Sequence, residues 1–147
     1  MSTAMLTLAV LALLSSGGPG RAQGGARLLP GDYQVTIRVE LPHMEDVGHS
    51  TEAVYHICVT AGDVGTHGLA ALSELNPLRD CPPSSVHHKG DTLTFNIVCP
   101  GSDAAVGSAK YTLQDERFAG SITVKMGGKN MTMVERQSGR RVGNCLE

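Results

Sequence analysis

The chain has 147 residues, of which 41% are hydrophobic and only 3% aromatic, and its formal net charge is −2. This length allows one domain with a modest core. The core must be mostly aliphatic, with few large members: Tyr33, Tyr55, Tyr111, Phe95 and Phe118. The charged residues form no basic block, which argues against a nucleic-acid partner, because phosphate binding needs a concentrated positive face.

The N-terminus has the features of an export signal. Residues 5–14 form a continuous apolar run that is too short to span a bilayer. Small residues at Gly20 and Ala22 suit a signal peptidase, although a buried N-terminal helix stays the alternative because residues 1–4 contain no Lys or Arg. We predict a signal peptide at 1–22 and a flexible leader at 23–29, followed by one domain at 30–147 with no transmembrane segment and a periplasmic or extracellular location. No Cys lies near the cleavage point, so no lipid anchor is expected there.

Two strands are predicted first. Residues 31–41 alternate strictly between apolar and polar side chains, as a half-buried strand does, and Pro42 ends the run. A second strand is predicted at 51–60. Thr60 and Asp63 then resemble a helix N-cap and an acidic first turn, so one short helix at 69–75 is compatible with the sequence, although three nearby glycines weaken it.

A hairpin is predicted around Gly90, with residues 86–88 and 92–99 as its arms and a three-residue turn at 89–91. In that register Cys81 faces Cys99 within reach of a disulfide. Cys58 then pairs with Cys145 by elimination, which is one of three connectivities that four cysteines permit. An even number of cysteines in a short exported chain favours disulfides, and the absence of C-x-x-C pairs argues against zinc or iron–sulfur ligation.

Three further strands are predicted at 106–113, 117–126 and 130–136, with turns at 114–116 and at Gly127-Gly128. About seven strands in successive hairpins predict an all-β antiparallel meander, curled into a barrel, a half-barrel or a sandwich. Arg136, Arg140 and Arg141 are interpreted as a small basic tail on a solvated edge.

The order of these motifs resembles an uncharacterised family of exported bacterial proteins, number 3617 in the series of domains of unknown function. The resemblance covers nearly all of residues 30–145, and it implies export and disulfides but no activity. The first loop of this chain has fewer methionines than is usual in that family. The matching motifs are Pro30-Gly31-Asp32-Tyr33, Leu41-Pro42-His43-Met44, Cys58-Val59-Thr60, Cys81 and Cys99 around Gly90, residues 118–124, Met131-Thr132-Met133, and residues 141–145.

Few residues are candidates for chemistry. Met131 and Met133 share one strand face, and Met126 lies across the glycine turn, so the three are weak candidates for a Cu(I) site. We favour the alternative that they fill a core poor in aromatic residues. There is no G-x-S-x-G motif, and the predicted disulfides leave no thiolate nucleophile. We therefore expect no enzyme activity and no cofactor.

The sequence thus predicts an exported, non-enzymatic β domain that binds a small apolar ligand or a protein partner at a curved sheet. The alternative is a copper-handling protein that uses Met and His side chains. The sequence does not identify a ligand.

Overall fold

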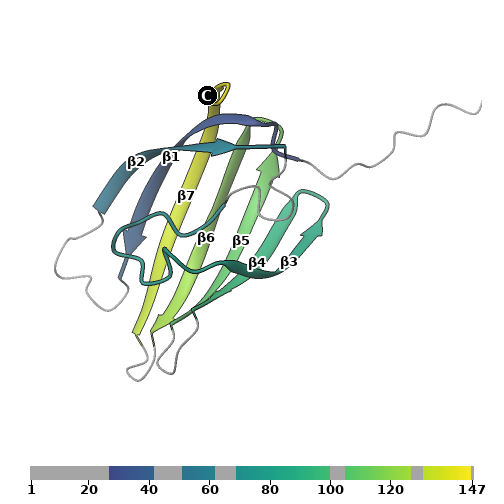
Figure 1. Ribbon diagram of the computed structural model, residues 1–147. Coiled ribbons are helices and arrows are strands. Elements are labelled where there is room, and N and C mark those ends of the chain that lie inside the picture. The colour runs from purple at the N-terminus through teal and green to yellow at the C-terminus, as the bar shows by residue number, and fades with distance from the viewer. Residues whose placement is uncertain (1–26, 42–50, 62–68, 100–104, 127–130, 147) are drawn as a thin grey trace, which may run out of the picture.

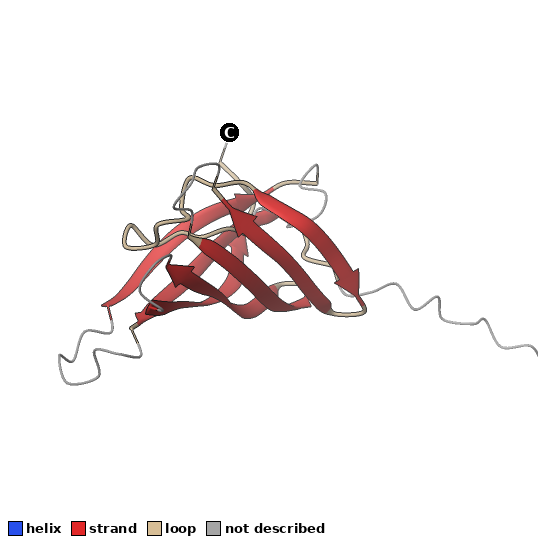
Figure 2. Ribbon diagram, turned by 90° about the horizontal axis from the view of Figure 1, so that it is seen from below, coloured by secondary structure: helices blue, strands red, loops and turns tan. Residues whose placement is uncertain are grey.

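The computed structural model describes residues 27–41, 51–61, 69–99, 105–126 and 131–146. These form one seven-stranded antiparallel sheet in the order β2-β1-β7-β6-β5-β4-β3, which is curved but not closed (Figures 1 and 2). The predicted all-β meander is confirmed, and it takes the form of an open sheet. The strands are β1 (Gly31–Glu40), β2 (Thr51–Val59), β3 (Pro83–Lys89), β4 (Thr92–Val98), β5 (Val106–Gln114), β6 (Arg117–Met126) and β7 (Met131–Gly143).

The predicted signal peptide, and the predicted leader up to residue 26, lie outside the described residues. Within the part of the chain that the structure describes, no helix is long and apolar enough to cross a membrane.

The strand order forces the chain to cross the sheet once. β2 and β3 follow each other in sequence but lie at opposite edges, so the connection between them passes over one face. We call residues 69–82 the covering segment, and Figure 1 shows it in front of the sheet. The short helix considered for 69–75 is not formed there, and these residues adopt turns and irregular structure.

Each strand alternates between two faces. The covered face lies under the covering segment and holds the core, which includes the buried side chains of Leu69, Ala71 and Leu78 from that segment. The open face carries the alternating polar side chains. The alternation predicted for β1 is observed, since Tyr33, Val35, Ile37 and Val39 are buried.

The β3–β4 hairpin differs by one residue from its prediction. Lys89 pairs with Thr92, so the turn has two residues, Gly90 and Asp91, and Gly90 has a φ of 62° that favours glycine. A bulge between Ser84 and His87 then shifts the register, with Ser85 at a φ of 51°. This bulge restores the predicted register beyond it, where Pro83 pairs with Ile97.

The last strand is longer than predicted. β7 continues to Gly143 and lies between β1 and β6. The interpretation of Arg136, Arg140 and Arg141 as a tail on a solvated edge is therefore wrong, because these residues belong to a central strand. The prediction failed because residues 135–141 are all polar or glycine, a composition typical of solvent-exposed chain rather than of a central strand.

Aromatic rings on the covered face pack against glycines of neighbouring strands. Phe118 lies directly opposite Gly139, and Tyr111 lies opposite Gly120. A Cβ atom on Gly139 or Gly120 would meet the facing ring within 2.5 Å, so any side chain there must displace it. The rings of Tyr33, Phe118, Tyr111 and Phe95 continue as a row of contacts from β1 to β4, with centroids about 6 Å apart.

Two disulfides are present, and they join the pairs that the sequence favoured. Cys81–Cys99 ties the end of the covering segment to the end of β4, with the Cα atoms 5.2 Å apart. Cys58–Cys145 ties edge strand β2 to the chain beyond β7, with the Cα atoms 5.4 Å apart. Together they fix both edges of an open sheet.

We expect the two bridges to contribute unequally to stability. They close loops of 87 and 18 residues, and in the chain-entropy model such loops correspond to about 4.5 and about 3 kcal/mol. Replacing Cys58 and Cys145 together with Ala should therefore lower the free energy of unfolding more than replacing Cys81 and Cys99. Urea unfolding of the two double variants measures this, and the opposite order would contradict the loop-length argument.

Candidate functional site

The open face consists of rows of side chains that run across the strands, because the register places residues of neighbouring strands directly opposite one another. We name three rows by their members on β1. The Gln34 row is His56, Gln34, Arg140, Arg117 and Gln114. The Thr36 row is Val54, Thr36, Ser138, Ala119, Thr112, Thr92 and Lys89. The Arg38 row is Glu52, Arg38, Arg136, Ser121, Lys110, Thr94 and His87.

The Arg38 row contains a pair of arginines that is electrically compensated. Arg38 and Arg136 lie opposite each other on β1 and β7. Arg38 forms an ion pair with Glu52 at 3.2 Å, and Arg136 forms one with Glu40 at 2.8 Å. The hydrogen bond to Glu40 also raises the pKa of the Arg136 guanidinium. Each positive charge in this pair therefore has its own carboxylate.

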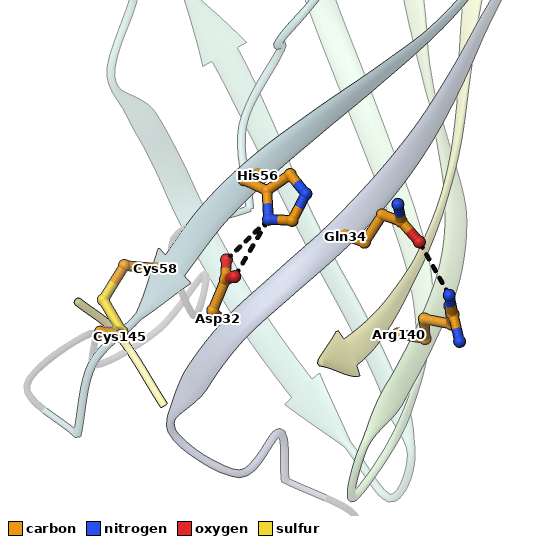
Figure 3. A network of polar contacts seen from close by, with 6 residues as sticks. All are labelled: Asp32, Gln34, His56, Cys58, Arg140 and Cys145. Carbon is orange, nitrogen blue, oxygen red and sulfur yellow. Dashed lines mark hydrogen bonds and ion pairs between the residues drawn. A yellow bond between two sulfur atoms is a disulfide. The ribbon is translucent and has the colours of Figure 1, made fainter. Parts of the chain in front are cut away.

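The Gln34 row contains a second arginine pair, and in the part of the chain that the structure describes this pair has no carboxylate partner. Arg117 and Arg140 lie opposite each other on β6 and β7, where Cβ atoms are about 5 Å apart. Arg140 donates to the neutral amide oxygen of Gln34 at 2.9 Å (Figure 3). Among the described residues, no carboxylate lies within ion-pair distance of either guanidinium. Asp115 and Glu116, in the turn next to Arg117, also form no ion pair with either guanidinium.

A groove of about 460 Å³ lies between the Gln34 row and the Thr36 row of the open face, and both Arg117 and Arg140 line it. Its other polar lining consists of amide and hydroxyl groups from Gln34, Gln114, Thr36, Thr112 and Ser138. No Asp, Glu, His or Cys lines it. The groove can thus hold an anion through charge-assisted hydrogen bonds from the guanidinium groups.

Two further hollows lie on the same face. One is lined by His87, Lys89, Thr92, Thr94 and Lys110, and the other shares His87, Thr94 and Lys110 with it. Neither has an acidic residue in its lining. The chain as a whole is slightly acidic. The excess of basic over acidic residues around these hollows is therefore a property of the open face and not of the overall composition.

The covered face holds a buried polar network centred on Glu135 of β7, whose side chain is fully buried. One carboxyl oxygen accepts hydrogen bonds from the backbone amides of Leu72 and Ser73, at 2.9 and 3.3 Å, and from the Gln137 amide at 2.7 Å. The other accepts from the Asn76 amide at 2.6 Å. Every partner donates, so the group acts as a carboxylate does.

This network extends to the sheet and to the covering segment. The Gln137 amide also donates to the backbone oxygen of Ala70 at 2.7 Å, and its own oxygen accepts from the Tyr111 hydroxyl at 3.0 Å. Burial, and then the charge of Glu135, raise the pKa of Tyr111 well above its ordinary value. The network attaches the irregular covering segment to the middle of the sheet.

The residues predicted as a weak metal site are only partly brought together. Met126 and Met131 lie opposite each other at the ends of β6 and β7, whereas Met133 is buried in the core. Among the described residues, no three His, Cys, Asp or Glu side chains form a cluster that could hold a metal ion.

An acidic residue and a histidine meet beside the Cys58–Cys145 bridge. The Nδ1 atom of His56 on β2 lies 3.0 Å from the Oδ2 atom of Asp32 on β1 (Figure 3). The pair therefore acts as a link between the two strands.

Sequence reasoning missed Glu135, Gln137 and the Arg117–Arg140 pair. Period-two alternation from Met133 would have placed Glu135 and Gln137 on the core face. No comparable signal exists for Arg117 and Arg140, because only the pairing register brings them together.

A family model described as protein of unknown function (DUF3617) matches residues 28–145. No curated protein and no solved structure matches the chain significantly.

We expect Glu135→Ala to destabilise the fold strongly. The substitution leaves the amides of Leu72, Ser73 and Asn76 without an acceptor and removes one of the two acceptors of the Gln137 amide, and one unsatisfied group alone costs about 1–3 kcal/mol. The matched control is Glu52→Ala, which removes an exposed carboxylate whose ion pair is worth about 1 kcal/mol or less. Urea unfolding followed by circular dichroism compares them, and equal losses would contradict an anchoring role for Glu135.

We expect stability to fall in alkaline solution through Tyr111. Its pKa is raised in the folded state, so its contribution is fully present below about pH 10, where an unfolded tyrosine ionises. The contribution is lost as the pH rises through the higher folded pKa. Tyr111→Phe should flatten this alkaline decline and should also cost about 1 kcal/mol at neutral pH, through the lost hydrogen bond to Gln137. Unfolding free energies measured from pH 8 to 11 would contradict this if both proteins showed the same slope.

Proposed function

Because the chain belongs to the DUF3617 family of proteins of unknown function, we propose a function from its open face. The protein is an exported, non-enzymatic binding domain that takes an anionic ligand in the groove between the Gln34 and Thr36 rows. Arg117 and Arg140 supply the charge that holds the ligand.

Two observations support export. The apolar run at 5–14 and the small residues before residue 23 fit a cleaved signal. Two disulfides are compatible with an oxidising compartment such as the periplasm or the exterior.

The uncompensated arginine pair carries the proposal for the ligand. Like charges directly opposite each other in a sheet destabilise it. The same face shows how such a pair is compensated, since Arg38 and Arg136 each have a carboxylate partner. An anionic ligand at Arg117 and Arg140 would play the part that Glu52 and Glu40 play for the other pair.

The covered face supports this choice over the small apolar ligand expected from the sequence. Its apolar side chains pack against the covering segment, and they include fully buried residues from β1, β4, β5 and β6. Glu135 fixes that segment in place. The hollows of the described residues discussed above all lie on the open face.

The chemistry of the groove supports binding without reaction. Guanidinium, amide and hydroxyl groups line it, and at neutral pH these donate and accept hydrogen bonds but do not exchange protons with a substrate. Binding by such groups is reversible and weakens as salt is added.

We expect Arg117→Gln/Arg140→Gln to weaken the binding of small anions. Galacturonic acid and inorganic phosphate serve as probes, titrated into ¹⁵N-labelled protein and followed by NMR shifts of the backbone amides on β6 and β7. Losing charge-assisted hydrogen bonds worth about 1.5–3 kcal/mol should weaken binding at least about tenfold.

The control is Arg38→Gln/Arg136→Gln, which removes the same amount of charge from the same face. It should retain binding, because those guanidinium groups already have carboxylate partners. An equal loss of anion affinity in the two double variants would show that only the overall charge of the face matters, and it would refute a specific site. Shifts confined to other strands would refute the location.

A further inference from the structure

The row of residues that lines the groove continues across the sheet beyond the arginine pair. Thr112, at one end of the groove, lies directly opposite Thr92, which lines the next hollow. That hollow ends at Lys89 on edge strand β3. The Thr36 row therefore lines first the groove and then this hollow, and we call the stretch of the open face along the row from β1 to β3 the channel.

The channel runs at right angles to the strands. Its floor steps from Thr36 through Ser138, Ala119, Thr112 and Thr92 to Lys89, each directly opposite the next. Five steps at the usual strand spacing correspond to about 24 Å. A single small anion at Arg117 and Arg140 would occupy only part of this length.

Positive charges accompany the channel along its course. Arg140 and Arg117 stand on one side, Lys110 stands on the other, and Lys89 lies at the far end. Within the described residues none of the four has a carboxylate within ion-pair distance. Strands β7, β6, β5 and β3 thus each contribute to the channel one cation that has no carboxylate partner among the described residues.

Building on the proposed function, we infer that the ligand is a linear acidic oligosaccharide whose chain lies in this channel and crosses the strands. Its carboxylates meet Arg140, Arg117, Lys110 and Lys89 in turn. A hexuronate residue is about as long as the spacing between neighbouring strands, so a chain of such residues can present its carboxylates at the spacing of the cations.

The neutral groups of the channel favour a sugar over other polyanions. Gln34, Gln114 and the threonine hydroxyls can both donate and accept hydrogen bonds, and so can sugar hydroxyls. A polyphosphate chain offers only acceptors. Nucleic-acid strands need aromatic surfaces for stacking, whereas Phe95, Tyr111 and Phe118 are buried on the covered face.

The test uses galacturonate oligomers of one, three and six residues with the full mature protein, by calorimetry or NMR titration. We expect the hexamer to bind at least about tenfold more tightly than the monomer, since additional carboxylates reach additional cations. Lys89→Gln should weaken hexamer binding several-fold and leave monomer binding unchanged, because the monomer occupies the arginine end. Lys125→Gln is the charge-matched control, since Lys125 faces the same side on β6 but lines none of the hollows.

Several outcomes would overturn this inference. Equal affinities for all lengths, or equal effects of Lys89→Gln and Lys125→Gln, would show that the ligand does not extend along the channel. Equal or tighter binding of polyphosphate or single-stranded DNA would refute the sugar. All of these results leave the proposed function standing, whereas binding that survives Arg117→Gln/Arg140→Gln would refute the proposed function itself.

Discussion

The buried carboxylate of Glu135 is the contact on which the rest of the structure depends. Because β2 and β3 lie at opposite edges, the chain must cross one face of the sheet, and the covering segment at 69–82 forms no helix or strand. Backbone amides buried in such a segment need acceptors from elsewhere. Glu135 provides one for Leu72 and Ser73. Placing a carboxylate there is costly unless donors surround it, and the four donors meet that requirement.

Because Glu135 anchors the covering segment, the two faces of the sheet have different roles. The covering segment closes the core, which aliphatic side chains and four aromatic rings fill between them. The covered face therefore stabilises the protein, and the opposite face is left as the surface on which polar side chains can be arranged for recognition. An open sheet also keeps two free edges, and each disulfide holds one of them. The strands that bear the rows of the open face thus belong to a sheet in which a disulfide restrains each edge.

Alternation of apolar and polar residues predicts most of this fold, because a sheet with one buried face imposes period two on its strands. It fails where the pairing register of two strands shifts by one residue. The turn at Gly90 is shorter than expected, and the bulge near Ser85 compensates for it, so the cysteine pairing was predicted through a register that is correct only beyond the bulge. At Glu135 alternation gives the correct face, but the residue was missed because a charged side chain in a strand is ordinarily assigned to solvent.

The open face could not be predicted from the sequence, for a different reason. Arg117 and Arg140 are far apart in the chain and become neighbours only through the pairing of β6 with β7. What makes them informative is the comparison within one molecule. Arg38 and Arg136 form an equivalent pair one strand away, in the same solvent, and there each guanidinium has a carboxylate. The fold compensates one arginine pair with its own side chains, whereas the described residues supply no carboxylate to the other, and this difference is what favours an anionic ligand for that pair.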